Sequence, residues 1–338
     1  MEGLQNKKSQ LIGIGVMAVF ITAAIAYILK DESIDNIVKA IHTVKPIYII
    51  IGIILMFIYI SCEGVNIWIT MKTLKKKTTL LDCIKFAFVG FYFCSITPSA
   101  SGGQPAQVYF MNRKGLSVTS SSLALLIILF AHQVVVVIYA IMALFMGPDL
   151  SVTHSTGFHI LIGYGIIANA SIFIGILLLI FYPKIVYKII NAIGKLSYRI
   201  NIIKNKDKLK KKIEGAIEEY RNGARYMKEN PKVLIYVTII TVFQVTVFFM
   251  IPYIIYIGFG LHKYNALDLI MAQAVLNIAV SSLPIPGAVG VSESIFVDMF
   301  RVFFGGLVIP GMLLTRIANF YVALIVSGMV SLYAYARR

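Results

Sequence analysis

Charged residues are scarce in this 338-residue chain: Asp, Glu, Lys and Arg make up 14%, against 59% hydrophobic residues. That balance excludes an ordinary soluble domain, in which about a quarter of the residues are charged. Several apolar runs reach the roughly 20 residues that a helix needs to cross a bilayer. The runs are continuous rather than alternating, which excludes a transmembrane β-barrel. We therefore expect an all-α polytopic membrane protein.

Cysteines and catalytic motifs are also few or absent. Cys62, Cys83 and Cys94 form no CxxC or CxxxH pattern, so neither a disulfide framework nor a metal site is expected. The motifs HExxH, GxSxG and DxD are missing, which argues against an intramembrane enzyme acting on a lipid. The phosphate loop GxxxxGK[ST] is missing too, so ATP should not drive transport. We expect no catalytic residue, no metal and no cofactor.

Acidic residues are half as frequent as basic ones, 15 against 31, which gives a net charge of +16. The basic residues gather in loops between apolar runs, and no basic stripe is interleaved with exposed aromatic residues, so nucleic acid is not an expected partner. The positive-inside rule places both termini in the cytoplasm with 72–78, 113–114 and 184–231. It places outside the segments 30–45, 147–157 and 259–265.

Six full spans are predicted, at about 11–29, 46–70, 120–146, 158–182, 232–258 and 308–334. Two other apolar segments, 81–114 and 266–305, must be re-entrant hairpins, because full crossing would move basic loops to the wrong side. Span, hairpin and span then occur twice in opposite orientation. The chain is thus expected to be one transmembrane domain, 1–338, with a first repeat at 46–146 and an inverted second repeat at 232–334. Inverted repeats recur in transporters.

The segment 184–231 is unusually basic for a loop. Its isoleucine residues recur at helical spacing between lysines, which predicts a cytoplasmic amphipathic helix lying on the membrane. An anionic lipid surface is the natural partner for that charge. The same segment could instead bind a separate lipid-modifying enzyme.

Two Pro- and Gly-rich motifs interrupt the two re-entrant segments: Thr97–Pro105 (TPSASGGQP) and Leu283–Glu293 (LPIPGAVGVSE). Aligning Pro98 with Pro286 also aligns Gly102 with Gly290. Broken helices at corresponding places in two halves indicate a transporter's binding site. A half-helix should begin after each glycine turn, with Gln104 and Ser292 as the respective caps and Pro105 in the first turn. Two such N-termini at the membrane midplane favour an anion, above all a phosphate.

Polar residues predicted at similar depth complete a candidate site. Arg316 lies about eight residues into the last span, where a buried arginine costs about 2.5–3.5 kcal/mol and needs a partner or a purpose. It could pair with Glu63 or Glu293 for packing alone, or either carboxylate could meet a cationic headgroup. His132, Gln133 and Asn169 are expected to serve packing. The candidate substrate-binding residues are Gly102, Gly103, Gln104, Gln107, Gly290, Ser292, Glu293, Glu63, Asn277, Arg316 and Asn319.

At these residues the chain resembles the lysylphosphatidylglycerol synthase transmembrane-region family, which includes the flippase module of the multiple peptide resistance factor. The resemblance rests on Thr97–Gln107, followed by Val108, Tyr109 and Phe110, and on Pro284–Glu293, and it covers essentially the whole chain. It implies a bacterial plasma-membrane protein that moves a phospholipid headgroup across the bilayer. The fused members carry a synthetase after the membrane module, whereas this chain stops after its last span. We therefore expect a stand-alone member that does not itself attach lysine.

Many relatives in that family have Glu and Arg in the first motif, where this chain has Gln104 and Gln107, so the headgroup stays open. The leading hypothesis is a flippase for an aminoacyl-phosphatidylglycerol-like lipid or a related anionic lipid or glycolipid. A lipid phosphate would sit between the half-helix N-termini and Arg316. The alternatives are a secondary carrier of a small soluble anion and an accessory lipid-binding subunit of a separate synthetase. A homo-oligomer is neither required nor excluded.

Overall fold

The computed structural model describes residues 34–146, 156–182, 228–281 and 283–336, with isolated positions between 188 and 225. Within these ranges every regular element is a helix or a helical turn. The predicted first span, 11–29, and most of the basic segment 184–231 lie outside the described residues. The expected all-α architecture is therefore confirmed for the part that can be seen.

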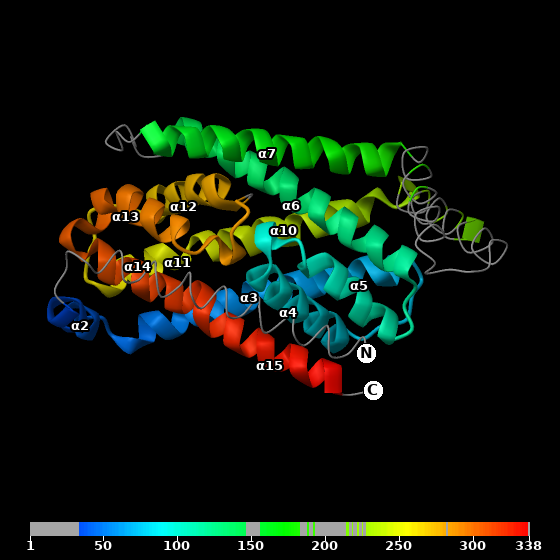
Figure 1. The fold of residues 1–338 in the computed structure, drawn as a ribbon, viewed down its shortest axis with the longest axis horizontal. Coiled ribbons are helices and arrows are strands. Elements are labelled where there is room, and N and C mark those ends of the chain that lie inside the picture. Colours follow the sequence, from blue (N-terminus) through cyan, green and yellow to red (C-terminus); the bar gives the residue numbers. More distant parts are fainter. Residues whose placement is uncertain are drawn as a thin grey trace.

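The chain forms two groups of helices joined by a long helix, α7 (Thr156–Phe181), which packs on α6 and α12 (Figure 1). The first group comprises α3 (Pro46–Thr73), α4 (Leu80–Ile96), the turn η1 (Pro98–Ala100), α5 (Gly103–Arg113) and α6 (Val118–Met146). The second comprises α10 (Pro231–Phe249), α11 (Ile251–Gly258), α12 (Ala266–Ser281), the turn η3 (Pro286–Ala288), α13 (Val291–Phe304), the turn η4 (Gly305–Leu307), α14 (Val308–Arg316), the π-helical turn η5 (Ile317–Tyr321) and α15 (Val322–Ala336).

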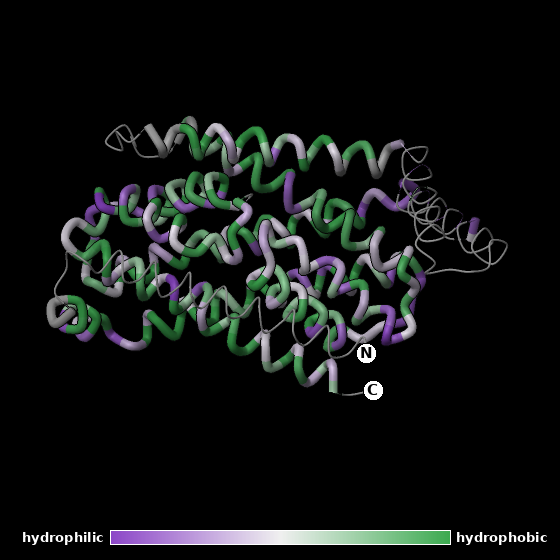
Figure 2. Tube along the Cα trace, viewed as in Figure 1, coloured by the Kyte–Doolittle hydropathy of each residue, from purple (hydrophilic) through white to green (hydrophobic). Residues whose placement is uncertain are grey.

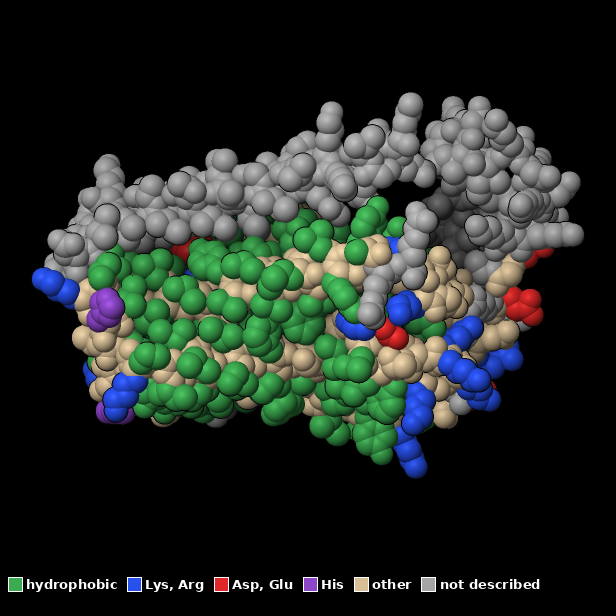
Figure 3. All heavy atoms as spheres, turned by 90° about the horizontal axis from the view of Figure 1, so that it is seen from below, with side chains coloured by type: hydrophobic (Ala, Val, Ile, Leu, Met, Phe, Trp, Pro, Cys, Tyr) green, Lys and Arg blue, Asp and Glu red, His purple; other side chains and the backbone are tan. Residues whose placement is uncertain are grey.

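Four of the described helical stretches are long and apolar enough to cross a membrane: 46–73, 118–143, 231–258 and 286–336. Figure 2 shows that most residues along the helices are hydrophobic. Many large apolar side chains are exposed on these helices, and Figure 3 shows them covering one face of the molecule. On that face the charged side chains gather at the two ends of an apolar band, mostly basic ones at one end. The protein is thus a membrane protein with several spanning helices.

Three predicted segments differ from the structure. The expected external loop 30–45 contains a helix, α2 (Ile34–Thr43), whose Ile37 packs with the core of the second group. The predicted span 232–258 is divided at Met250, because Pro252 in the next turn lacks a backbone donor. The predicted span 308–334 is divided into α14, η5 and α15.

Each broken segment folds as a helical hairpin, since α4 packs on α5 and α12 packs on α13. The four helices contain 17, 11, 16 and 14 residues respectively. At 1.5 Å per residue the longest reaches about 25 Å, short of the roughly 30 Å of bilayer hydrocarbon. None of the four is therefore long enough to cross a membrane on its own.

Contacts between the two groups are reciprocal. Helix α3 packs on its counterpart α10, and η1 packs on its counterpart η3. Helix α4 packs on α15, and correspondingly α12 packs on α6. The reciprocal contacts bring the tips of both hairpins together near the middle of the molecule (Figure 1).

Candidate functional site

The aligned motifs build the same backbone turn. After Pro98, Ser99 and Ala100 have φ values of 50° and 53°. After Pro286, Gly287 and Ala288 have φ values of 60° and 50°. Residues other than glycine are uncommon in this left-handed region, and such strained positions cluster at functional sites. The two hairpin tips are therefore alike in conformation as well as in sequence.

A half-helix begins directly after each glycine turn, as predicted, but the predicted caps are wrong. Helix α5 begins at Gly103 with Gly102 as its N-cap, so Gln104 is already the second helical residue and is exposed. Helix α13 begins at Val291 with Gly290 as its N-cap. A glycine has no side chain with which to cap a helix. At α13 the Glu293 carboxylate reaches back instead and accepts from the Gly290 N–H at 2.6 Å.

Arg316 is bound at the start of α13. Its Nε lies 2.8 Å from Glu293 Oε1, and its Nη2 donates to the Ser292 hydroxyl. That hydroxyl also lies 2.7 Å from the Ala288 carbonyl and 2.9 Å from Glu293 Oε2. The Glu293 side chain is 2% exposed and that of Arg316 15% exposed. A buried arginine is thus neutralised by a buried carboxylate, and the Phe320 ring lies 5.3 Å from the guanidinium carbon.

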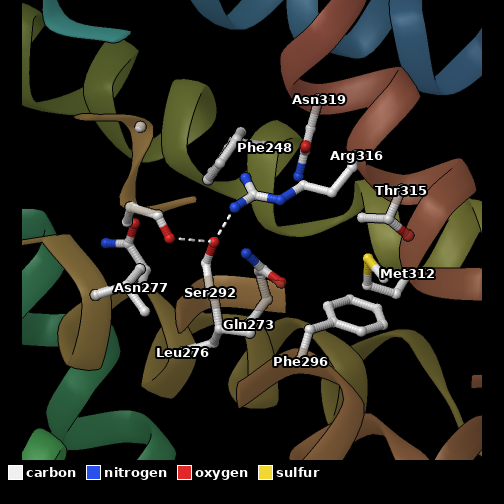
Figure 4. Close-up of a pocket in the computed structure, with 13 residues that line it drawn as sticks. Phe248, Gln273, Leu276, Asn277, Ser292, Phe296, Met312, Thr315, Arg316 and Asn319 are labelled. Carbon is white, nitrogen blue, oxygen red and sulfur yellow. Dashed lines mark hydrogen bonds between the residues drawn. The ribbon is translucent and has the colours of Figure 1, made fainter. Parts of the chain in front are cut away.

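A cavity of about 70 Å³ opens beside this pair. It lies between η3, α12, α13 and the junction of α14 with η5. One water molecule needs about 10–15 Å³ on the same measure, so several would fit. Figure 4 shows the Arg316 guanidinium reaching into this space above Ser292, with Asn277 and Gln273 on the opposite side. Glu293 does not line the cavity, and it binds the Nε side of the Arg316 guanidinium.

Several polar atoms around the cavity have no hydrogen-bond partner among the described residues. They are Gln273 Oε1, Thr315 Oγ1 and Asn319 Oδ1, on side chains that are 4%, 2% and 7% exposed. Arg316 Nη1 also makes no hydrogen bond to a described residue, while Nε and Nη2 are engaged. Buried polar atoms are normally paired, and each such exception asks for an explanation.

The first hairpin holds a different polar centre. Gln107, in α5, donates from Nε2 to Glu63 Oε1 on α3 at 2.6 Å. A Cβ added to Gly90 of α4 would lie 2.3 Å from that amide nitrogen, so α4 and the Gln107 side chain are in close contact. Within the described residues Glu63 has no ion-pair partner, and it is Glu293 that binds Arg316. Glu63 and Gln107 therefore form a pair apart from the cavity.

The structure brings some of the predicted residues together and not others. Arg316, Ser292, Asn277 and Asn319 line the cavity, with Glu293 and Gly290 directly behind. The others, Gly102, Gly103, Gln104, Gln107 and Glu63, belong to the first hairpin and its neighbour α3. The predicted packing role of Gln133 and Asn169 fits their contacts, since Gln133 on α6 donates to Asn169 on α7, which donates to Ser281 on α12.

Other lining residues were not among the predicted site residues, including Gln273, Thr315 and Phe248. Gln273 precedes Asn277 by four residues and so shares its helix face, a signal that was available. Thr315 and Phe248 carry no distinguishing sequence signal. The π-helical turn that follows Arg316 was also missed, although π-bulges within helices often mark functional sites.

Comparison with known proteins finds sequence similarity over most of the chain. A family model described as "Lysylphosphatidylglycerol synthase TM region" matches residues 10–327. A UPF0104 membrane protein of Archaeoglobus fulgidus is 24% identical over 295 residues, which cover 84% of each chain. A UPF0104 membrane protein of Methanothermobacter thermautotrophicus is 24% identical over 306 residues, 88% of this chain and 86% of the relative.

Proposed function

This chain belongs to the lysylphosphatidylglycerol synthase transmembrane-region family, and on that premise we propose that it moves a phospholipid headgroup across the membrane. One observation carries the proposal. A largely buried, neutralised arginine borders a small, mostly apolar cavity with a few polar side chains, beside the joined tips of two broken helical hairpins. Ligand sites at the meeting point of broken helices are characteristic of secondary transporters.

The proposed membrane arrangement follows from the same features. Both hairpins are re-entrant, and 46–146 and 232–334 are inverted repeats. The short hairpin helices, the matching left-handed turns and the reciprocal packing of α4 on α15 and α12 on α6 all support this arrangement. The basic end of the molecule faces the cytoplasm, as the positive-inside rule requires, and the same rule assigns both termini to that side.

The Arg316–Glu293 pair stabilises the empty site and still allows Arg316 to bind an anion. When the site is empty, the carboxylate compensates the buried guanidinium. A lipid phosphate would bind first at Nη1 and then compete with Glu293 for the rest of the guanidinium fork. Glu293 would keep its bond from the Gly290 N–H, so its own charge would stay stabilised. The acyl chains would remain in the bilayer throughout.

Reconstitution into liposomes tests this function. Vesicles would contain the full-length protein and labelled phospholipids, and an impermeant reagent would report how fast inner-leaflet headgroups become accessible. We expect movement of one lipid class by the wild type. Arg316→Lys keeps the charge but loses the guanidinium fork, so it should lower the rate at least tenfold. Arg113→Lys is the matched control, because Arg113 is exposed at the end of α5.

Two results would argue against the proposal. Folded Arg316→Lys protein that moves lipid at the wild-type rate would remove Arg316 from the mechanism. Wild-type protein that moves no lipid, under an imposed potential and pH gradient, would favour the soluble-anion carrier or the accessory subunit. Uptake of a soluble phosphate ester into the same vesicles distinguishes those two alternatives.

A further inference from the structure

Two of the three buried polar side chains that have an unpartnered atom at the cavity, among the described residues, are of one chemical kind; the third is the Thr315 hydroxyl. Gln273 and Asn319 are carboxamides, each with an acceptor oxygen and a donor nitrogen, and both are more than nine-tenths buried. Their oxygens have no partner among the described residues. Figure 4 shows Gln273 and Asn319 on opposite sides of the Arg316 guanidinium. A hydroxyl group, which both donates and accepts, is the natural complement of a carboxamide.

A cationic headgroup would need something that the cavity lacks. An ammonium group at this depth requires a carboxylate to compensate its charge. No carboxylate lines the cavity in the described part of the chain. Glu293 lies behind Arg316 and is bound to it, and Glu63 lies with Gln107 at the first hairpin. The cavity therefore offers an aminoacyl group no counter-charge.

Arg316 Nη1 supplies the remaining element, because its two N–H groups can donate to a phosphate oxygen. We infer that the cavity binds an uncharged polyol attached to a phosphoester, such as the glycerol or sugar headgroup of an anionic lipid. The phosphate meets Arg316, and the hydroxyl groups meet Gln273 and Asn319. This inference rests on the proposed function and specifies its substrate class.

The first experiment compares three lipids in the liposome assay. Phosphatidylglycerol has a vicinal diol that impermeant periodate cleaves. Its lysyl ester has an amine that an impermeant amine reagent modifies. Phosphatidic acid, as a binding competitor, carries the phosphate without hydroxyl groups. We expect the wild type to move phosphatidylglycerol faster than its lysyl ester, and phosphatidylglycerol to bind more tightly than phosphatidic acid.

Variants then show which residues distinguish phosphatidylglycerol from the other two lipids. Gln273→Ala and Asn319→Ala should each weaken phosphatidylglycerol binding by roughly two- to tenfold, the loss expected for one hydrogen bond, and leave phosphatidic acid binding unchanged. Asn112→Ala, at an exposed amide near the end of α5, is the control. Gln273→Glu places a carboxylate in the cavity and should shift the preference toward the lysyl ester. The expected shift in lipid preference of Gln273→Glu tests the inference even if an alanine variant fails to fold.

The outcomes separate the inference from the function that it specifies. If the lysyl ester moves as fast as phosphatidylglycerol in the wild type, the inference is wrong and the lipid transporter remains. If no lipid moves but soluble glycerol phosphate is taken up, the polyol phosphate chemistry stands and the lipid function falls. If neither a lipid nor glycerol phosphate moves or binds, both are overturned.

Discussion

The two hairpins have similar backbone conformations but different polar side chains. Both have short helices, a Pro-initiated turn with two left-handed residues, and a half-helix that begins directly after it. Both also begin with the same cap, since Asp82 N–H bonds to Thr79 Oγ1 and Asp268 N–H bonds to Asn265 Oδ1, each at 3.1 Å. The contents of the two tips differ, however.

In the first hairpin, Gln107 donates a hydrogen bond to the Glu63 carboxylate, which has no cationic partner among the described residues. At the second, Arg316 neutralises Glu293 beside an open cavity. The comparison teaches that two similar broken hairpins can differ in their polar contents, since the arginine–carboxylate pair and the cavity occur at the second one. Four predictions test how far this difference goes.

Removal of one partner of the charge pair should have the largest effect. Arg316→Met leaves the Glu293 carboxylate buried and uncompensated, which should lower the free energy of unfolding by about 3–5 kcal/mol. The double variant Arg316→Met/Glu293→Gln removes both charges and should recover most of that loss. Thermal unfolding in detergent measures both variants. Equal stability of the single and double variants would contradict a pair that compensates itself.

Packing at the first tip should be the next most sensitive feature. A Cβ added at Gly103 would lie 2.1 Å from Cys94 Sγ and 2.9 Å from the Gly90 carbonyl oxygen. Gly103→Ala should therefore cost about 1–3 kcal/mol of unfolding free energy. Gly163→Ala in α7 is the control, because no atom lies within 4 Å of its added Cβ. Equal stability of the two variants would show that the first tip is not closely packed.

The two carboxylates should respond differently to the same substitution. Glu63→Gln removes a carboxylate that has no cationic partner in the described part of the chain, so it should change the free energy of unfolding by less than about 1 kcal/mol, or raise it. Glu293→Gln leaves the guanidinium unpaired and should behave like Arg316→Met. Chemical unfolding of both variants under one condition gives the comparison. A larger loss for Glu63→Gln would reverse the assignment of roles.

The smallest effect is expected at the entrance to the first hairpin. Burial alone would raise the pKa of Asp82, but the Thr79 hydroxyl and the nearby ammonium groups of Lys114 and Lys85 together lower it. The stability that this carboxylate contributes is therefore present above its ordinary pKa and is lost as pH falls through the lowered value. It should amount to about 1 kcal/mol or less.

Asp82→Asn should accordingly flatten the acid side of the stability profile slightly. Asp268→Asn is the matched variant, since Asp268 begins the second hairpin and has no ion pair within the described residues. An equal change in the two acid profiles would mean that the lysines contribute nothing at Asp82.

The sequence was sufficient to predict both breaks and the need of Arg316 for a carboxylate partner. Pro98 and Pro286 restrict the backbone whatever surrounds them, so both turns could be predicted from local chemistry. Arg316 and Glu293 were expected at similar depth because a charge in an apolar run needs a partner. Which carboxylate served as partner depended on tertiary packing, which the sequence left open.

Other features depended on details that local rules do not resolve. Gln104 was predicted as a cap because Pro105 favours the first turn, but the helix begins two residues before that proline. The division at Met250 had a signal in Pro252 that the long apolar run obscured. Phe248 reaches the cavity from α10, far from Arg316 in the sequence, so its place there depends on tertiary packing. The π-helical turn after Arg316 had no sequence signal that we identified.

Lipid movement by the Arg316→Met/Glu293→Gln double variant tests the central claim most directly. This variant keeps the site neutral and should fold like the wild type, so loss of movement cannot be attributed to a stranded charge. We expect it to sediment and unfold like the wild type in detergent and to move no labelled phospholipid in liposomes. A folded double variant that moves lipid at the wild-type rate would contradict a headgroup site at Arg316.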